Sequence, residues 1–446
     1  MTEETFSLRE TPRDAFWSLM RSSYGISDRL LELAAECERE LGPIFGSIDE
    51  VAQINQLKVL TAMQRSRLSD IHFAATTGYG YNDLGRDALE NIYADVFGCE
   101  SALVRPQLIS GTHALTTALF GNLRHGDELL SPVGVPYNTL QKVIGIQEAR
   151  GSLIEHGVSY RQVDLLPEEG ASGAGRGLID YDAVESAISP RTKIATIQRS
   201  KGYTWRRSLS VREIGELVSF IKGIRKDIIC MVDNCYGEFV ECIEPSEVGA
   251  DMVVGSLIKN PGGGLAPVGG YIAGSEESVA NAAARLTSPG LGREVGPTLG
   301  VVPQLAQGLF LAPAVVAASL RTAVYSAKLL DRLGFETLPR FDEARSDIVQ
   351  AIKMGTPEKV VAYCRGIQRA AAVDSFAAPE AGDMPGYDSR VIMAAGAFVQ
   401  GASIELSADS PMKPPYIVFQ QGALTWWHGK IGALVALDAL DKKGLL

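Results

Sequence analysis

The pattern of hydrophobic and polar positions changes character twice along the chain. Up to residue 70, apolar residues recur every three or four positions over 28–41 and 51–67, which predicts two helices separated at Gly42-Pro43. From about residue 100, short apolar runs alternate with amphipathic stretches. Strands are expected at 101–104, 127–131, 193–198, 228–233, 251–256 and 270–273, and helices at 112–122, 137–149, 211–225 and 276–285. This alternation predicts an α/β fold whose mostly parallel sheet is covered by helices on both faces.

The pattern changes again after about residue 315. A long alanine-rich helix is expected at 314–333, strands at 335–339, 348–352 and 391–398, and a final helix at 422–440. These elements indicate a smaller α+β domain, and no low-complexity linker separates it from the preceding region. We therefore divide the chain into an N-terminal helical arm (1–70), a large α/β domain (71–315) and a small C-terminal α+β domain (316–446).

Composition and charge narrow the class of protein. The 446 residues are 46% hydrophobic and 21% charged, as in ordinary globular proteins. A formal net charge of −11 argues against nucleic acid or an anionic membrane as a partner. The first residues contain no signal-peptide pattern. The longest apolar stretch, 309–320, contains Pro313 and is shorter than the ~20 residues that span a bilayer.

The cysteines, histidines and glycines add three expectations. Six cysteines without a CxxC motif indicate a reducing compartment, so we expect a cytoplasmic protein. Five scattered histidines form no HxH or HxxxH pair, so no metal site is expected. Forty-six glycines exceed the roughly 31 that average usage would give, and some cluster, as at 262–264 and in the surface loop expected at 170–177. We expect the cluster at 262–264 to bring the backbone close to a ligand.

Four segments that follow predicted strands carry candidate chemistry, because open parallel sheets bind ligands at the carboxyl ends of their strands. Ser110, Gly111 and Thr112 open a helix and can bind an anion there, although Ser110 can equally be an ordinary N-cap. Tyr137 follows the 127–131 strand and can stack on a planar ligand or simply pack.

The other two segments carry a carboxylate and an amine. Asp233 ends a buried apolar run, where a carboxylate is costly unless it is paired, and it can cap a helix, bind a metal or pair with a ring nitrogen. Lys259 lies between a strand and three glycines and can form a Schiff base, or it can be an incidental lysine in a glycine-rich turn. With Ser256 and Tyr236 nearby, the set contains the groups that bind pyridoxal 5′-phosphate (PLP).

Longer motifs surround these residues, at 72–74, 78–81, 105–107, 110–114, 197–203, 232–239, 259–264 and 398–403. Through them the chain resembles the fold type I PLP-dependent enzymes of the aspartate aminotransferase type. It resembles more closely the methionine γ-lyase-like proteins of Cys/Met metabolism, also known as aluminium resistance proteins. The resemblance runs from about residue 55 to the C-terminus. It implies a mixed, mostly parallel seven-stranded sheet, a small α+β C-terminal domain and PLP as the cofactor.

The resemblance also implies roles for single residues. Lys259 would form the Schiff base with PLP and shuttle the α-proton, and Asp233 would keep the pyridine nitrogen protonated. Tyr137 would stack on the ring and act as an acid when the leaving group departs. The remaining cofactor contacts would come from Ser110, Gly111, Thr112 and Ser256 at the phosphate, Tyr236 at the 3′ oxygen, and Tyr79 or Tyr81 of a neighbouring subunit at the phosphate. The protein is therefore expected to be a homodimer or a homotetramer.

Relatives of this kind bind the substrate carboxylate with an arginine. The candidates here are Arg199, Arg390 and Lys413, and Lys413 stands where the relatives lead us to expect an arginine. The resemblance predicts a carbon–sulfur lyase that releases a thiol, a keto acid and ammonia from a sulfur amino acid. The alternatives are another PLP reaction, such as transamination or racemisation, and a catalytically silent PLP-binding stress protein.

Overall fold

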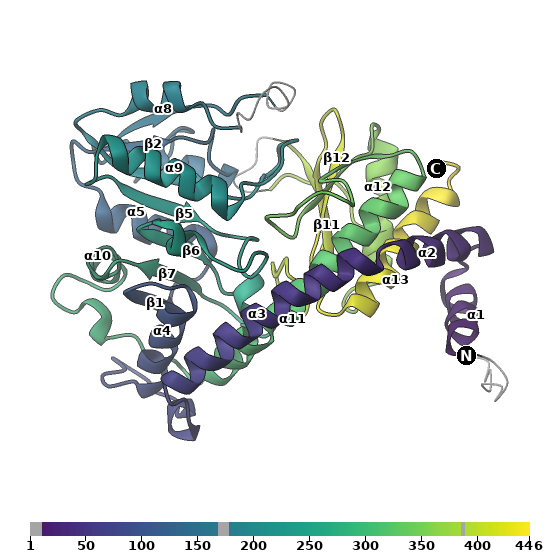
Figure 1. The fold of residues 1–446 in the computed structure, drawn as a ribbon, viewed down its shortest axis with the longest axis horizontal. Helices are drawn as coiled ribbons and strands as arrows, with labels where there is room; N and C mark the ends of the chain where they lie inside the picture. The colour runs from purple at the N-terminus through teal and green to yellow at the C-terminus, as the bar shows by residue number, and fades with distance from the viewer. Residues whose placement is uncertain (1–10, 168–177, 385–388) are drawn as a thin grey trace.

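The protein contains two sheets that lie side by side and are joined by long helices (Figure 1). The structure is a computed structural model and describes residues 11–167, 178–384 and 389–446. The first ten residues and the loop expected at 170–177 lie outside the described residues.

The larger sheet is built from residues between 101 and 274. Its strands are β1 (Ser101–Arg105), β2 (Glu128–Ser131), β3 (Ser159–Gln162), β4 (Thr192–Gln198), β5 (Ile229–Asp233), β6 (Met252–Ser256) and β7 (Gly270–Gly274). In the order β1-β7-β6-β5-β4-β2-β3, β7 runs antiparallel to β1 and β6, and the other neighbouring pairs of these strands are parallel. The predicted α/β fold with a mixed, mostly parallel sheet is confirmed. The six predicted strands agree with the structure to within one residue at each end.

Helices cover both faces of this sheet. One layer consists of α4 (Leu84–Val96), α8 (Tyr181–Ala187), α9 (Val211–Ile224) and α11 (Val302–Arg332), and the other of α5 (Gly111–Asn122), α6 (Asn138–Ile144) and α10 (Glu276–Leu286). Successive strand residues point to opposite layers: in β5, Cys230 and Val232 pack with the first and Met231 with the second. Because both faces are buried, the strands read as continuous apolar runs.

Two long helices, α3 (Gly42–Arg65) and α11, run beside one another from the region of the large sheet to that of the small sheet (Figure 1). The predicted break at Gly42-Pro43 coincides with the start of α3. A proline is tolerated in the first helical turn because the N–H that it lacks would have no partner there. α11 begins at Val302 instead of 314 and continues through Pro313. It therefore crosses the predicted boundary at 315–316, and the domain division stays a prediction.

The length and composition of α11 would allow it to cross a membrane. However, 78% of its most apolar window is buried inside the fold. This burial is typical of the core helix of a globular protein.

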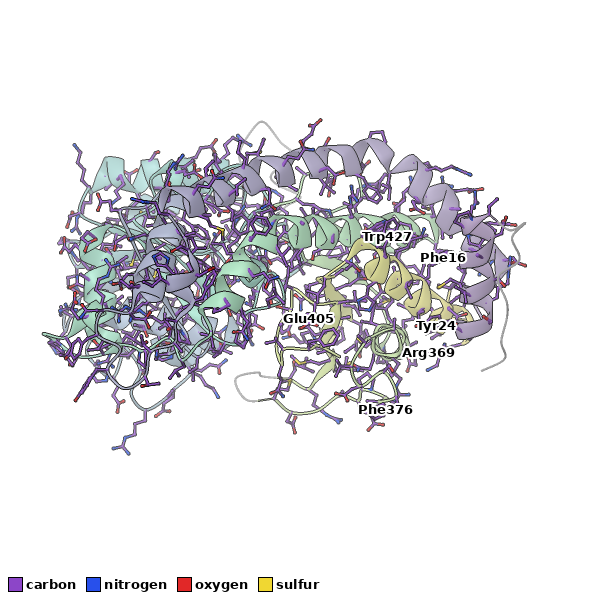
Figure 2. All side chains as sticks on the ribbon, turned by 90° about the horizontal axis from the view of Figure 1, so that it is seen from below. Phe16, Tyr24, Arg369, Phe376, Glu405 and Trp427 are labelled. Carbon is purple, nitrogen blue, oxygen red and sulfur yellow. The ribbon has the colours of Figure 1, made fainter. Side chains whose placement is uncertain are left out.

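The smaller sheet is antiparallel, with the order β10-β11-β12-β9-β8. Its strands are β8 (Glu336–Leu338), β9 (Gln350–Lys353), β10 (Val391–Ala394), β11 (Ser407–Pro411) and β12 (Ile417–Gln421). Helices α12 (Pro357–Arg369) and α13 (Trp426–Asp441) share its core, together with α1 (Pro12–Tyr24) and α2 (Asp28–Glu40). The side chain of Arg369 lies over the Tyr24 ring, with Cζ 5.5 Å from the ring centroid (Figure 2), and so ties the N-terminal helices to the small sheet.

Candidate active site

Asp233 and Lys259 lie just beyond the carboxyl ends of two neighbouring parallel strands. Asp233 is the last residue of β5, and Lys259 follows the last residue of β6 by three positions. Asp233 is 8% exposed and accepts the backbone N–H of Cys235 at 3.2 Å. The Nζ atom of Lys259 lies 4.1 Å from the centroid of the Tyr236 ring. Tyr236 has a φ of 74°, in the left-handed region that residues other than glycine seldom adopt.

The electrostatics of this pair follow from burial. Burial raises the pKa of Asp233, and the positive charge of Lys259 opposes that rise. Burial alone would lower the pKa of Lys259, but the nearby Cys235, Tyr236 and Asp233 groups raise it. The carboxylate therefore stands in surroundings where its charge is costly, and a further cationic N–H donor would stabilise it.

The N-terminus of α5 lies beside the end of β6. The Ser110 hydroxyl accepts the His113 N–H at 3.1 Å and caps the helix. At Gly111, an added Cβ would lie 3.2 Å from the Cβ of Ser256, so only glycine leaves this space free. The Thr112 hydroxyl lies 2.8 Å from that of Thr139. Gly111 and Thr112 are partly exposed residues at this helix N-terminus, where backbone N–H groups can bind an anion such as a phosphate.

A cavity of about 220 Å³ separates Lys259 from the small sheet. On the large-sheet side it is lined by Tyr137, Tyr236 and Lys259. On the other side it is lined by residues of β10–β12 and of the loop between β10 and β11: Met393, Ala394, Ala395, Ala397, Gly401, Ala402, Ser403, Ser407, Ala408, Asp409 and Gln421. The Ser403 hydroxyl donates to the Tyr236 hydroxyl at 3.1 Å, which joins the two sides.

A second cavity, of about 460 Å³, lies on the other side of Tyr137. Lys201, Arg206 and Lys413 contribute positive charge to its lining, and Tyr203 is also part of it. Lys201 is fully buried and donates to Asp347 at 3.2 Å and to the carbonyl of Val349 at 2.9 Å. Lys413 is the one proposed carboxylate ligand that lines either of these two cavities.

The structure places the two arginine candidates away from both cavities. The Arg199 side chain is fully buried and pairs with Glu241 at 2.7 Å and with Glu244 at 3.7 Å. Its charge is thus neutralised inside the fold, which corrects its assignment as a substrate ligand. Arg390 is exposed and donates to the carbonyl of Ala381, outside both linings.

The glycine triplet is explained by packing within the protein. A Cβ at Gly262 would lie 1.8 Å from the carbonyl oxygen of Leu257, and one at Gly263 would lie 2.3 Å from that of Gly308 in α11. Gly262 therefore permits the tight turn beside Leu257, and Gly263 lets the backbone approach α11, so the expectation that these glycines approach a ligand is corrected.

Tyr79 and Tyr81 lie on the surface of the protomer. They are 68% and 55% exposed, and their rings stack with centroids 5.6 Å apart. Their predicted use by a neighbouring subunit stays a prediction.

The sequence motif at 398–403 includes Ser403, but the sequence did not reveal the other polar residues on the small-sheet side of the first cavity. Its polar side chains are Ser403, Ser407, Asp409 and Gln421. Ser407 and Asp409 are two positions apart, which is the spacing of residues on one face of a strand, but nothing in the sequence links that segment to Lys259.

The residues of the large-sheet side fit PLP. A buried carboxylate at Asp233 suits a protonated ring nitrogen, the α5 N-terminus suits a phosphate, and the Lys259 amine suits a carbonyl carbon. Among the residues that the structure describes, no group of three or more His, Cys, Asp or Glu side chains is placed to hold a metal ion.

Comparisons with known proteins agree with this geometry. The methionine gamma-lyase family model matches residues 30–441. Protein YnbB of Bacillus subtilis, whose function is uncharacterized, is 49% identical over 419 residues, which cover 94% of this chain and 98% of YnbB.

Three solved structures are also similar. A carbon-sulfur lyase involved in aluminum resistance from Clostridium novyi is 48% identical, with a TM-score of 0.89 and coverage of 94% and 98% of the two chains. A proposed cystathionine beta-lyase involved in aluminum resistance from Clostridium acetobutylicum is 47% identical, with a TM-score of 0.91 and coverage of 96% and 99%. The PLP-dependent protein YhfS of Escherichia coli, at 15% identity and a TM-score of 0.59, shares the fold over 89% and 97% of the chains.

Proposed function

Because the chain belongs to the methionine gamma-lyase family, we propose that it is a PLP-dependent carbon–sulfur lyase acting on a sulfur amino acid. The observation that carries the proposal is the placement of Lys259 and Asp233 at the ends of neighbouring parallel strands, beside a cavity bounded by two tyrosines. When bound, PLP supplies an electron sink that lowers the cost of removing the α-proton.

The residues of the chain divide the remaining work. The Lys259 amine would hold the cofactor covalently and then carry the α-proton of the substrate. The Asp233 carboxylate would hold a proton on the pyridine nitrogen, and that ion pair would in turn stabilise the buried charge. Tyr137 lines both cavities, so its hydroxyl would reach the sulfur as the carbon–sulfur bond breaks.

The substrate carboxylate would be attracted by Lys413. A lysine ammonium acts as a point charge, so it would orient the carboxylate less strictly than the two-pronged contact of an arginine. Ser110, Gly111, Thr112 and Ser256 would surround the phosphate at the α5 N-terminus.

The decisive experiment is incubation of the PLP-loaded protein with cystathionine, cysteine, homocysteine and methionine. We expect a thiol, a keto acid and ammonia from at least one of them. A keto acid that forms only when an acceptor keto acid is present would instead indicate transamination. Racemised amino acid without a keto acid would indicate a racemase.

Lys259→Ala tests the site assignment in the same assay. It should abolish the absorbance band of covalently bound PLP and lower turnover by about 10⁴-fold, because the variant lacks both the covalent link and the proton carrier. Lys226→Ala, at an exposed position between the end of α9 and β5, is the matched control and should keep both. Retention of the band in Lys259→Ala would refute the assignment.

A further inference from the structure

Three polar side chains of the small sheet, Ser407, Asp409 and Gln421, face the cavity beside Lys259. Ser407 and Asp409 are two positions apart on β11 and therefore share one face of the strand, and Gln421 of β12 pairs with Ser407. Ala408, between them, also belongs to the core of the small sheet. β11 thus presents a row of polar groups to the cavity, next to the apolar Met393.

Two atoms of this row lack a hydrogen-bond partner among the described residues. They are Ser407 Oγ and Asp409 Oδ1, and both atoms are buried. The other carboxylate oxygen of Asp409 accepts the Tyr203 hydroxyl at 2.9 Å. A buried oxygen without a partner is costly, and because these two residues line the cavity, a hydrogen-bond donor on a ligand would remove that cost.

Glu405 provides a comparison within the same segment. Its two carboxylate oxygens accept the N–H groups of Phe398 and Val399, at 2.9 and 3.0 Å. Both oxygens of this carboxylate therefore have a hydrogen-bond donor, and they hold the loop that precedes β11. The open oxygen of Asp409 is therefore a property of its own position and is not general to acidic residues here.

The charge of Asp409 also lacks a partner. No ion pair within the described part of the chain includes it, and burial raises its pKa to about 7 although Tyr203 and Lys259 oppose the rise. If PLP engages the Lys259 amine, the opposing positive charge on that amine changes as well. A cation brought by the substrate would then stabilise the carboxylate.

We propose that Asp409, assisted by Ser407, determines specificity by binding a cationic group that the substrate carries beyond its sulfur atom. The proposal rests on the proposed lyase function and names its substrate class: sulfur amino acids with a second amino group at the far end of the side chain. Met393 would contact the thioether part. A substrate such as methionine, which has no distal donor, leaves both open oxygens unpaired.

A pair of amino acids of equal length separates charge from size. S-(2-aminoethyl)-L-cysteine ends in an ammonium group, and S-propyl-L-cysteine ends in a methyl group at the same position. Their dissociation constants are measured on the PLP-loaded protein from the change in cofactor absorbance immediately after rapid mixing. We expect the aminoethyl compound to bind about tenfold more tightly or better, since hydrogen bonds between charged groups are strong.

Asp409→Asn removes the charge while keeping the shape of the side chain. The ratio of the two dissociation constants should fall to about one in this variant. Asp164→Asn removes a carboxylate from the neighbouring cavity and should keep the wild-type ratio. A preference that survives in Asp409→Asn would overturn the proposal, and so would equal affinities in the wild-type protein, a result that needs no variant to fold.

The same measurement distinguishes this proposal from the proposed lyase activity. The affinity ratio can be measured whether or not either compound is cleaved. A clear preference for the aminoethyl compound without release of thiol and keto acid would support the role of Asp409 and count against the lyase. Cleavage of both compounds with equal affinity would support the lyase and overturn the role of Asp409.

Discussion

The two sides of the cavity hold their carboxylates in different ways. Asp233 ends a parallel strand of the large sheet and has Lys259 as a cationic neighbour. Asp409 lies within an antiparallel strand of the small sheet, with one oxygen bound to Tyr203 and the other open. Parallel strands end at a shared edge, which gathers their terminal residues around one ligand. A strand face presents alternate residues along its length, which suits contact with an extended ligand.

This difference separates a fixed chemical site from a variable recognition surface. In the proposed function, the large-sheet side would supply the groups that hold PLP, and the small-sheet side would supply groups whose partner arrives with the substrate. A change on the first side should affect the reaction on every substrate. A change on the second should affect the choice among substrates. The buried pair Lys201–Asp347 joins the two sides, because Lys201 follows β4 and Asp347 precedes β9.

The largest effect on stability is expected when this joining pair is broken. Asp347→Asn would leave the fully buried Lys201 ammonium without its counter-ion and should lower the free energy of unfolding by about 3–5 kcal/mol. Urea denaturation of the PLP-loaded protein measures this loss. The double variant Lys201→Met, Asp347→Leu removes both charges and should recover part of it. A double variant less stable than Asp347→Asn would show that the hydrogen bonds of Asp347, and not its charge, hold the two sides together.

A smaller effect, confined to the reaction, is expected at Asp233. Asp233→Asn keeps the size of the side chain but cannot hold the pyridine nitrogen in its charged form. We expect kcat/KM to fall by about 10²–10³-fold on every substrate, as when one preorganised electrostatic group is removed. The absorbance of bound PLP should persist, because Lys259 remains.

Asp251 provides the matched control for this prediction. It lies at the opposite end of the same sheet, directly before β6, and it accepts the Cys230 N–H at 2.7 Å. Asp251→Asn should leave kcat/KM unchanged. If Asp233→Asn changed the ratio of kcat/KM between two substrates, and did not lower kcat/KM on all of them alike, the proposed division of work between the two sides would be wrong.

The large sheet could be predicted closely because its strands are buried on both faces and read as unbroken apolar runs. The positions of Asp233 and Lys259 followed from those runs, since both residues lie where a strand ends. The helix expected at 137–149 ends early, at Gly145, whose φ of 100° breaks it. That turn brings Gly145 against Ser152, and the local sequence pattern does not predict this contact.

The small-sheet side could not be predicted for a physical reason. The sequence of β11 is Ser-Ala-Asp-Ser-Pro, which has the polar composition of a loop. Its polar residues are suited to the strand because one face of β11 lines a cavity and not a core. The burial of Arg199 likewise depends on Glu241 and Glu244, which come from a separate segment after β5. Local pattern predicts where a strand ends, but it does not predict which distant residue neutralises a charge.

The smallest expected effect is the pH dependence that Asp409 adds to stability. Burial raises its pKa from 3.8 to about 7, so the folded protein binds this proton more tightly than the unfolded chain does. Its contribution to stability is therefore complete below pH 4 and is lost as the pH rises through 7. After allowance for the partial exposure of the side chain, the loss should be about 1–2 kcal/mol.

Asp409→Asn removes this titration and so isolates it. The free energy of unfolding of the wild-type protein, minus that of the variant, should be larger at pH 5 than at pH 8 by about two thirds of this amount, because the rest is lost between pH 4 and pH 5. The same comparison with Asp164→Asn, at an exposed position, gives the background. An equal difference at both pH values would mean that a cation already accompanies Asp409 in the unliganded protein. The small-sheet side would then resemble the large-sheet side, with its charge balanced before the substrate arrives.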